Sequence, residues 1–121
     1  MKRCVLIVDD DRDHADSIAD LVAMRGHEVV IAGSGEAGIE RFRERDFDLV
    51  LMDVKMPGMT GVDAFFELRK LRPDARVIMM TGFSVEQLVD RAVASGAIGV
   101  LRKPLAIPQL LQAIETLSLA P

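Results

Sequence analysis

Five short apolar runs recur along this chain of 121 residues, and they constrain its fold more than any other feature. Each run is four or five residues long, rich in β-branched side chains, and continuous instead of alternating between apolar and polar positions. A continuous run of this kind is typical of a strand that is covered on both faces, as in a parallel sheet. The runs occupy residues 4–8, 28–32, 49–52, 76–80 and 98–101.

Apolar side chains recur at helical spacing after each of these runs, which predicts one helix after each strand. Ser34 and Ser84 stand at N-cap positions, and Gly26 and Gly96 follow the first and fourth helices, where a left-handed glycine is favoured. A strand–helix unit repeated five times with right-handed crossovers predicts an α/β fold, a doubly wound parallel sheet between two helical layers. The five stripes are His14, Ile18, Leu21 and Val22; Gly38, Ile39 and Phe42; Val62, Phe65, Phe66 and Leu68; Leu88, Val89, Ala92 and Val93; and Leu110, Leu111, Ile114 and Leu117.

Composition narrows the classes of protein to which such a chain can belong. Fifteen Lys and Arg against nineteen Asp and Glu give a net charge of −4, which argues against direct binding of nucleic acid. The single cysteine, Cys4, cannot form an internal disulfide, and no apolar run reaches the roughly 18 residues that span a membrane. We therefore expect a single cytoplasmic domain with no membrane contact.

Polar side chains follow four of the five predicted strands at the point where each strand ends. In a doubly wound sheet the ligand site lies beyond the carboxyl ends of the strands, so we expect these side chains to converge on one rim. They are Asp9, Asp10 and Asp11 after the first strand, Asp53 at the end of the third, Thr81 after the fourth and Lys103 after the fifth.

The chemistry of this rim follows from its residue types. Clustered carboxylates repel one another, and hard oxygen ligands without cysteine favour Mg²⁺, with Mn²⁺ as a substitute. Lys103 offers a point charge and Thr81 a hydrogen-bond donor to the oxygens of a phosphoryl group. One carboxylate is then left to attack phosphorus, which predicts phosphoryl transfer that forms an aspartyl phosphate.

Four motifs in register carry a resemblance to a known family. They are Val8-Asp9-Asp10-Asp11, Asp53-Val-Lys-Met-Pro-Gly-Met-Thr-Gly61, Thr81-Gly82 and Lys103-Pro104. In this order, and over residues of about 2–117, the chain resembles a receiver domain of two-component response regulators. The resemblance implies one receiver domain over residues 1–121 with a flavodoxin-like or CheY-like fold, five strands in the order 2-1-3-4-5 and five helices. It also implies a signalling switch and not an enzyme with a separate substrate.

Carried over residue by residue, the resemblance implies that Asp53 accepts the phosphoryl group from a sensor histidine kinase or a phosphotransfer protein. Asp10 is implied to bind Mg²⁺ directly and Asp9 mostly through water. Asp53 itself and the backbone carbonyl of Lys55 complete the implied ligands.

The same resemblance implies how the signal leaves the site. Thr81 is the implied switch hydroxyl and Lys103 the implied phosphoryl-binding ammonium, with a cis peptide before Pro104. The family usually has an aromatic residue where this chain has Val100, so we expect output to run through the loop after the fourth strand to the face formed by helix four, strand five and helix five. The output would reach a C-terminal domain or a separate protein target. Lys55 and Phe83 line the implied path of the attacking water; the Phe83 ring cannot orient a water and a charged Lys55 cannot accept its proton, so we expect a long-lived phosphoryl group.

Other functions fit the residues less well. A Mg²⁺-dependent phosphohydrolase would want a second acid two residues after its nucleophile, where this chain has Lys55. A flavin or nucleotide site would want hydroxyl or glycine donors after the first strand, where Asp9, Asp10 and Asp11 would repel a phosphate without a metal. A receiver-like domain that binds partners without phosphate would lack part of the motif set.

Several other residues have simpler expected roles. We expect Asp11 in the first turn of the first helix, His14 as a partly buried packing residue and not a metal ligand, and His27 in a structural or exposed position. Met56 and Met59 are expected in an exposed loop, where a docking role is a minor alternative to packing.

Overall fold

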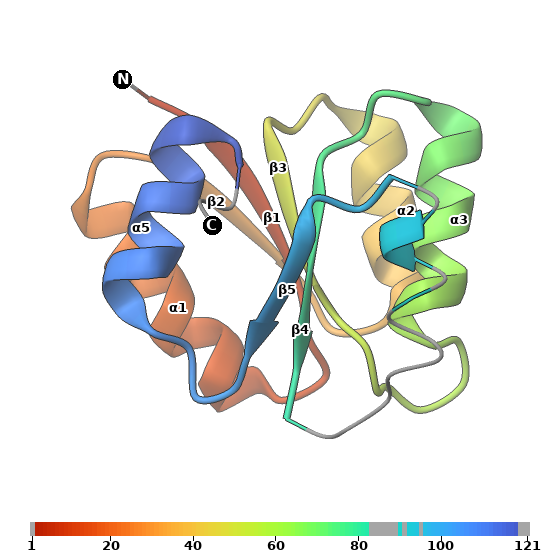
Figure 1. The fold of residues 1–121 in the computed structure, drawn as a ribbon, viewed down its shortest axis with the longest axis horizontal. Helices are drawn as coiled ribbons and strands as arrows, with labels where there is room; N and C mark the ends of the chain where they lie inside the picture. Colours follow the sequence, from red (N-terminus) through yellow and green to blue (C-terminus); the bar gives the residue numbers. More distant parts are fainter. Residues whose placement is uncertain (1, 83–89, 91, 95, 119–121) are drawn as a thin grey trace.

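The computed structural model describes residues 2–82, 90, 92–94 and 96–118, and within them five parallel strands form one sheet (Figure 1). The strand order is β2-β1-β3-β4-β5, which confirms the order that the resemblance implied. The strands are β1 (Cys4–Val8), β2 (Glu28–Ala32), β3 (Leu49–Asp53), β4 (Val77–Thr81) and β5 (Gly99–Arg102).

Helices cover both faces of the sheet, with α1 and α5 on one face and α2 and α3 on the other (Figure 1). Their bounds are α1 (Arg12–Met24), α2 (Gly35–Glu44), α3 (Gly61–Leu71) and α5 (Ile107–Thr116). Residues 90 and 92–94 are helical too, where the fourth helix was predicted, but Ser84, Leu88 and Val89 lie outside the described residues. Among the helices that are described, none has the length and apolar character needed to cross a membrane.

Alternate side chains of each central strand enter different cores, which explains why the apolar runs are continuous. Leu6 and Val8 of β1 pack into the core under α2 and α3. Val5 and Ile7 of the same strand pack into the core under α1 and α5. All five residues of β3 and all five of β4 are buried. Each fully buried large side chain of this kind contributes roughly 1.5–3 kcal/mol of apolar burial.

Helix ends follow local sequence signals. Asp11, Ser34 and Thr60 are the N-caps of α1, α2 and α3, and each side chain accepts a hydrogen bond from the backbone N–H three residues later. Ser34 confirms the sequence prediction, whereas the caps at Asp11 and Thr60 were not predicted. Gly26 and Gly96 have positive φ angles of 87° and 110°, as expected after a helix.

Two packing predictions were wrong. Met56 is buried in the core under α2 and α3 and does not lie in an exposed position of its loop. Val93 is 44% exposed, because its neighbour Ala92 occupies the buried side of the helical turn and consecutive helical positions point about 100° apart. Met59 is half-buried, with its side chain lying against Gly35.

His27 has a structural role, in agreement with the sequence prediction. The side chain is buried at the start of β2, where its Nδ1 accepts a hydrogen bond from the Arg3 N–H at 2.9 Å. Its Nε2 lies 3.1 Å from Oε1 of Glu115, so Nε2–H donates to that carboxylate. The imidazole therefore links the starts of β1 and β2 to the end of α5.

Candidate functional site

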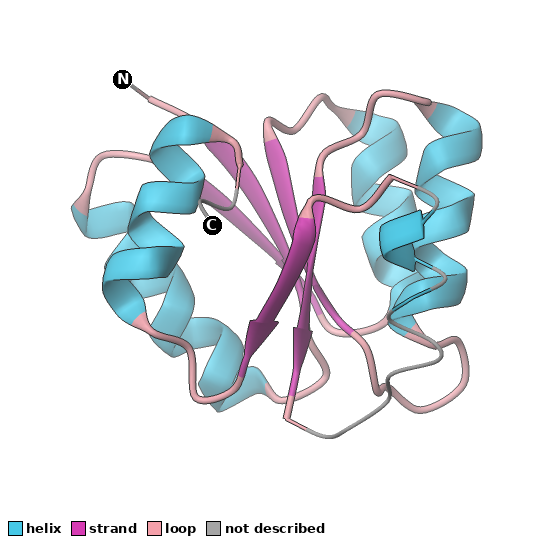
Figure 2. Cartoon of the chain, in the orientation of Figure 1, coloured by secondary structure: helices cyan, strands magenta, loops and turns pink. Residues whose placement is uncertain are grey.

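The predicted rim residues meet at the carboxyl edge of the sheet, where the strands run out into loops (lower edge in Figure 2). Asp53 and Thr81 are the last residues of β3 and β4, whereas Asp9 and Lys103 directly follow β1 and β5. A hollow of about 270 Å³ lies beside Asp53, Thr81 and Lys103. It is lined by Asp10, Asp11, Asp53, Lys55, Thr81, Gly82 and Lys103.

Three carboxylates form a group that could hold a metal ion. Asp9, Asp10 and Asp53 each offer one oxygen atom, and these atoms all lie within 4.8 Å of one another. Asp9 and Asp53 are buried, whereas Asp10 is exposed. The donor set consists of hard carboxylate oxygens, with no thiolate or imidazole nitrogen among them, and this chemistry fits Mg²⁺.

Lys103 provides the positive charge inside the site. Its Nζ lies 3.1 Å from Oδ2 of Asp9 and 3.4 Å from Oδ2 of Asp53, so one ammonium pairs with carboxylates from two strands. Burial alone would lower the pKa of Lys103, but the charges of Asp53 and Asp9 together with their hydrogen bonds raise it. The lysine is therefore charged at neutral pH.

The two buried carboxylates have pKa values that move in opposite directions. Burial raises the pKa of Asp53 to about 6, and the neighbouring charge of Asp9 adds to this effect more than Lys103 offsets it. Burial would also raise the pKa of Asp9, but hydrogen bonds from His14, the Asp11 N–H and Lys103 hold it below its usual value. Of the two carboxylates, Asp53 is therefore the more basic.

Backbone hydrogen bonds fix the positions from which these side chains extend. The Asp9 N–H donates to the carbonyl of Ala32 at 3.0 Å, and the Lys103 N–H donates to the carbonyl of Thr81 at 2.8 Å. The Gly61 N–H donates to the carbonyl of Val54 at 2.8 Å, which brings the start of α3 against the end of β3. A Cβ on Gly61 would lie only 1.9 Å from the carbonyl oxygen of Asp53.

The structure brings together the predicted side chains of Asp9, Asp10, Asp53, Thr81 and Lys103. Thr81 is buried beside the hollow, Lys55 is exposed at its edge, and the Lys103–Pro104 peptide is cis. A ligand role for the Lys55 carbonyl stays a prediction. Phe83 lies outside the described residues.

His14 is a contact of the site that the sequence prediction missed. Its Nδ1 lies 2.6 Å from Oδ2 of Asp9, so the ring does more than pack against its neighbours. The signal was available, because side chains in the first turn of a helix point back toward its N-terminus, where Asp9 stands.

The comparisons with known proteins agree with this geometry. Residues 5–115 match the family described as the response regulator receiver domain. The chain belongs to this family. Proteins of the family are phosphoacceptors in two-component signalling, and this is the function of the receiver described here.

Curated relatives are longer than this receiver. A response regulator receiver protein of Anaeromyxobacter is 37% identical over 109 residues, which cover 90% of this chain and 46% of the relative. The transcriptional regulatory protein PdtaR of Mycobacterium tuberculosis is 40% identical over 114 residues, covering 93% of this chain and 55% of the relative. The chain thus spans about half the length of these two relatives, and 25% of ZraR from Escherichia coli O157:H7.

Solved structures show the same fold. A CheY-like receiver domain from Methanospirillum hungatei superimposes with a TM-score of 0.90 at 32% identity, covering 96% of this chain and 93% of that one. A complex of CheX and CheY with BeF₃ and magnesium from Borrelia burgdorferi gives a TM-score of 0.87 at 28% identity, covering 95% and 88% of the two chains.

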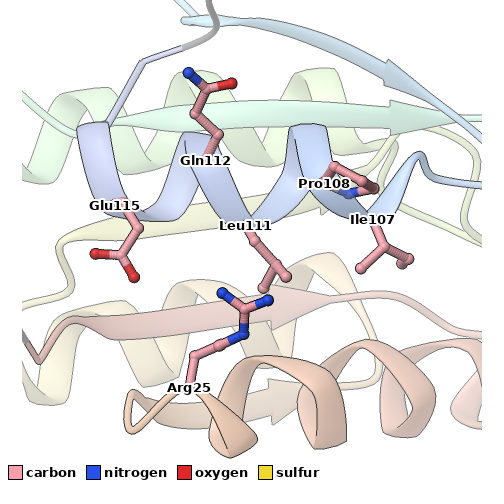
Figure 3. Close-up of a pocket in the computed structure, with 6 residues that line it drawn as sticks. All are labelled: Arg25, Ile107, Pro108, Leu111, Gln112 and Glu115. Atoms are coloured by element: carbon pink, nitrogen blue, oxygen red, sulfur yellow. The ribbon is translucent and has the colours of Figure 1, made fainter.

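A second hollow of this receiver, about 410 Å³ in volume, lies between α5 and the end of α1 (Figure 3). Its lining residues are Arg25, Ile107, Pro108, Leu111, Gln112 and Glu115. None of these described residues lines the hollow at Asp53, and two of them, Arg25 and Glu115, are charged.

Proposed function

We propose that this receiver is phosphorylated on Asp53, with a sensor histidine kinase or a phosphotransfer protein as the phosphoryl donor. The observation that carries the proposal is the placement of this buried carboxylate, 3.4 Å from the Lys103 ammonium and within 4.8 Å of the Asp9 and Asp10 oxygens. Asp53 is also the carboxylate whose pKa is raised, to about 6, so it is basic yet ionised at neutral pH.

Mg²⁺, with Mn²⁺ as a substitute, is the cofactor that this proposal assigns to Asp9, Asp10, Asp53 and the Lys55 carbonyl. When bound, the ion neutralises charge on the phosphoryl oxygens. The fit is supported by the all-oxygen donor set and by the Borrelia CheY structure, which is a complex with BeF₃ and magnesium.

The protein residues perform the transfer as follows. A carboxylate oxygen of Asp53 attacks phosphorus and forms a new P–O bond. The bond from phosphorus to the donor imidazole nitrogen, or to the acetate oxygen of acetyl phosphate, breaks, and its electron pair stays on that nitrogen or oxygen. Lys103 turns from the carboxylates toward a phosphoryl oxygen, and the Thr81 hydroxyl donates a hydrogen bond to another. Hydrolysis of the product returns the site to its starting state, so self-phosphorylation and slow self-dephosphorylation are the only activities proposed.

Intact-mass spectrometry after incubation with acetyl phosphate and Mg²⁺ tests the acceptor. The parent should gain the mass of one phosphoryl group, and Asp53→Asn or excess chelator should abolish the gain. Asp13→Asn is the matched control, because Asp13 is an exposed aspartate in the first turn of α1 that is not part of the carboxylate group. Undiminished labelling of Asp53→Asn would refute the assignment.

We propose further that Thr81 couples the site to the face of helix four, β5 and α5. Val100 is half-buried against the core under α2 and α3, and a β-branched valine is too stiff and too small to switch as an aromatic ring would. With beryllofluoride as the phosphoryl mimic, amide NMR shifts along 84–95 should change, Thr81→Ala should suppress the change, and Val100→Ala should leave it nearly intact. The opposite pattern would exclude this route.

A cytoplasmic location and a coupled output domain or protein target complete the proposal. The support comes from the relatives, two of which are named transcriptional regulatory proteins and are longer than this chain. Pull-down of the phosphorylated and Asp53→Asn forms would test whether a target depends on phosphorylation.

A further inference from the structure

Asp9 is held by three hydrogen bonds in a position without solvent contact. Its side chain is 0% exposed. Oδ1 accepts a hydrogen bond from the Asp11 N–H at 2.9 Å, whereas Oδ2 accepts from His14 at 2.6 Å and from Lys103 at 3.1 Å. An ionised carboxylate has only acceptor sites, so Nδ1 of His14 carries the hydrogen in this contact.

The contact between His14 and Asp9 closes a ring of hydrogen bonds at the start of α1. The Asp11 N–H holds one oxygen of Asp9, the Asp11 side chain accepts from the His14 N–H at 3.1 Å, and the His14 ring holds the other oxygen of Asp9. Because both carboxylate oxygens are tied to the same helix start, the carboxylate cannot rotate about its last torsion without breaking one of these bonds.

Lys103 and His14 share Oδ2 of Asp9, but they differ in their freedom to leave it. Lysine extends on a flexible four-carbon stem, and its ammonium is also 3.4 Å from Asp53. The shorter His14 side chain has its backbone fixed by the Asp11 cap. When Lys103 turns toward a phosphoryl group, His14 is the remaining described side chain on that buried oxygen.

We propose that His14 is a positioning residue, whose Nδ1–H holds Asp9 so that its oxygen stays within reach of those of Asp10 and Asp53 while Lys103 moves. The inference rests on the proposed function, because it concerns a carboxylate assigned to the metal. Loss of a hydrogen-bond partner behind a metal ligand typically weakens metal binding about 10- to 100-fold.

Mn²⁺ affinity of the full chain, measured by electron paramagnetic resonance of the free ion without any phosphodonor, tests this role. His14→Leu keeps an apolar side chain for packing but removes the donor, and should weaken Mn²⁺ binding about 10- to 100-fold. His14→Asn places an N–H donor at the same distance from Cβ as Nδ1, and should bind within about threefold of the parent. Arg12→Ala removes an exposed cation of the same helix, paired with Asp16, and should bind as the parent does.

The outcomes separate this inference from the proposed function. Equal or tighter binding by His14→Leu, with a parent that binds Mn²⁺, would overturn the role of His14 and leave the metal assignment standing. Failure of His14→Asn to recover affinity would also overturn it, because the donor would not be the cause. A parent that binds no more tightly than Asp10→Asn would refute the metal assignment, and the role of His14 with it.

Discussion

Gly61→Ala is expected to destabilise the fold although it replaces glycine by a better helix former. Gly61 is the first residue of α3, and alanine is favoured over glycine inside a helix by about 1 kcal/mol. The substitution creates a steric clash, because the new Cβ would lie 1.9 Å from the carbonyl oxygen of Asp53, and real Cβ contacts essentially never fall below 3.0 Å. That oxygen is backbone of a buried central strand and cannot rotate away.

The size of the effect follows from what must move. The start of α3 has to withdraw from β3 by about 1 Å, which costs roughly 1–3 kcal/mol of packing in a tight core. The 2.8 Å hydrogen bond from the Gly61 N–H to Val54 is also stretched, at about 0.5–1.5 kcal/mol. After the gain in helix propensity, we expect a net loss of about 1–3 kcal/mol.

Urea unfolding followed by far-UV circular dichroism measures this loss, because the chain has no Trp and no Tyr for fluorescence. With a slope of about 1.5 kcal/mol per molar urea, the midpoint should fall by roughly 0.7–2 M. Gly35→Ala is the matched control, since Gly35 opens α2 and the three atoms nearest to its Cβ would all belong to the flexible Met59 side chain, the closest at 3.1 Å. Its midpoint should move by less than about 0.5 M. Equal midpoints for the two variants would refute the steric reasoning.

Three further experiments test contacts outside the site. Ser34→Ala removes the acceptor of the Ala37 N–H at the start of α2 and should cost about 1 kcal/mol in the same urea assay; no loss would mean that water replaces the cap. Arg72→Ala removes a guanidinium 4.3 Å from the centroid of the Phe42 ring together with a 2.7 Å hydrogen bond to the Phe42 carbonyl. It should lower the free energy of unfolding by roughly 1–2 kcal/mol, whereas Arg72→Lys should lower it by less, because the cation is kept. Burial raises the pKa of the Cys4 thiol, so iodoacetamide at about pH 8 should alkylate the folded chain more slowly than the urea-unfolded chain by mass spectrometry; equal rates would contradict this.

The sheet and the rim residues could be predicted because their signals are local. The continuous run of β1 and the acidic residues after it lie side by side in the sequence, and parallel pairing then brings four strand ends to one edge. The strand order came from the family resemblance, since apolar runs alone do not say which strands are neighbours.

The rest depended on contacts across the fold that no local pattern records. Met56 follows a strand and a lysine, as an exposed loop residue would, yet its side chain completes the core under α2 and α3. The close approach of Gly61 to Asp53 likewise required the distance between a helix start and a strand end. His14 is the exception, because it stands five residues after Asp9; its place in an apolar stripe favoured packing over the hydrogen bond that the structure shows.

Lys103 belongs to the edge of the sheet, yet its charge is used near the middle. It follows β5, and its ammonium reaches past β4 to carboxylates at the ends of β3 and β1. Edge strands fray more easily than central ones, and fraying of β5 would withdraw the counter-charge while the carboxylates stayed in place. With Asp53 as the proposed acceptor, phosphorylation would therefore depend on how firmly β5 is docked. A partner that covers β5 would favour the docked form by mass action, and under the same proposal would promote phosphorylation of Asp53 without contacting it.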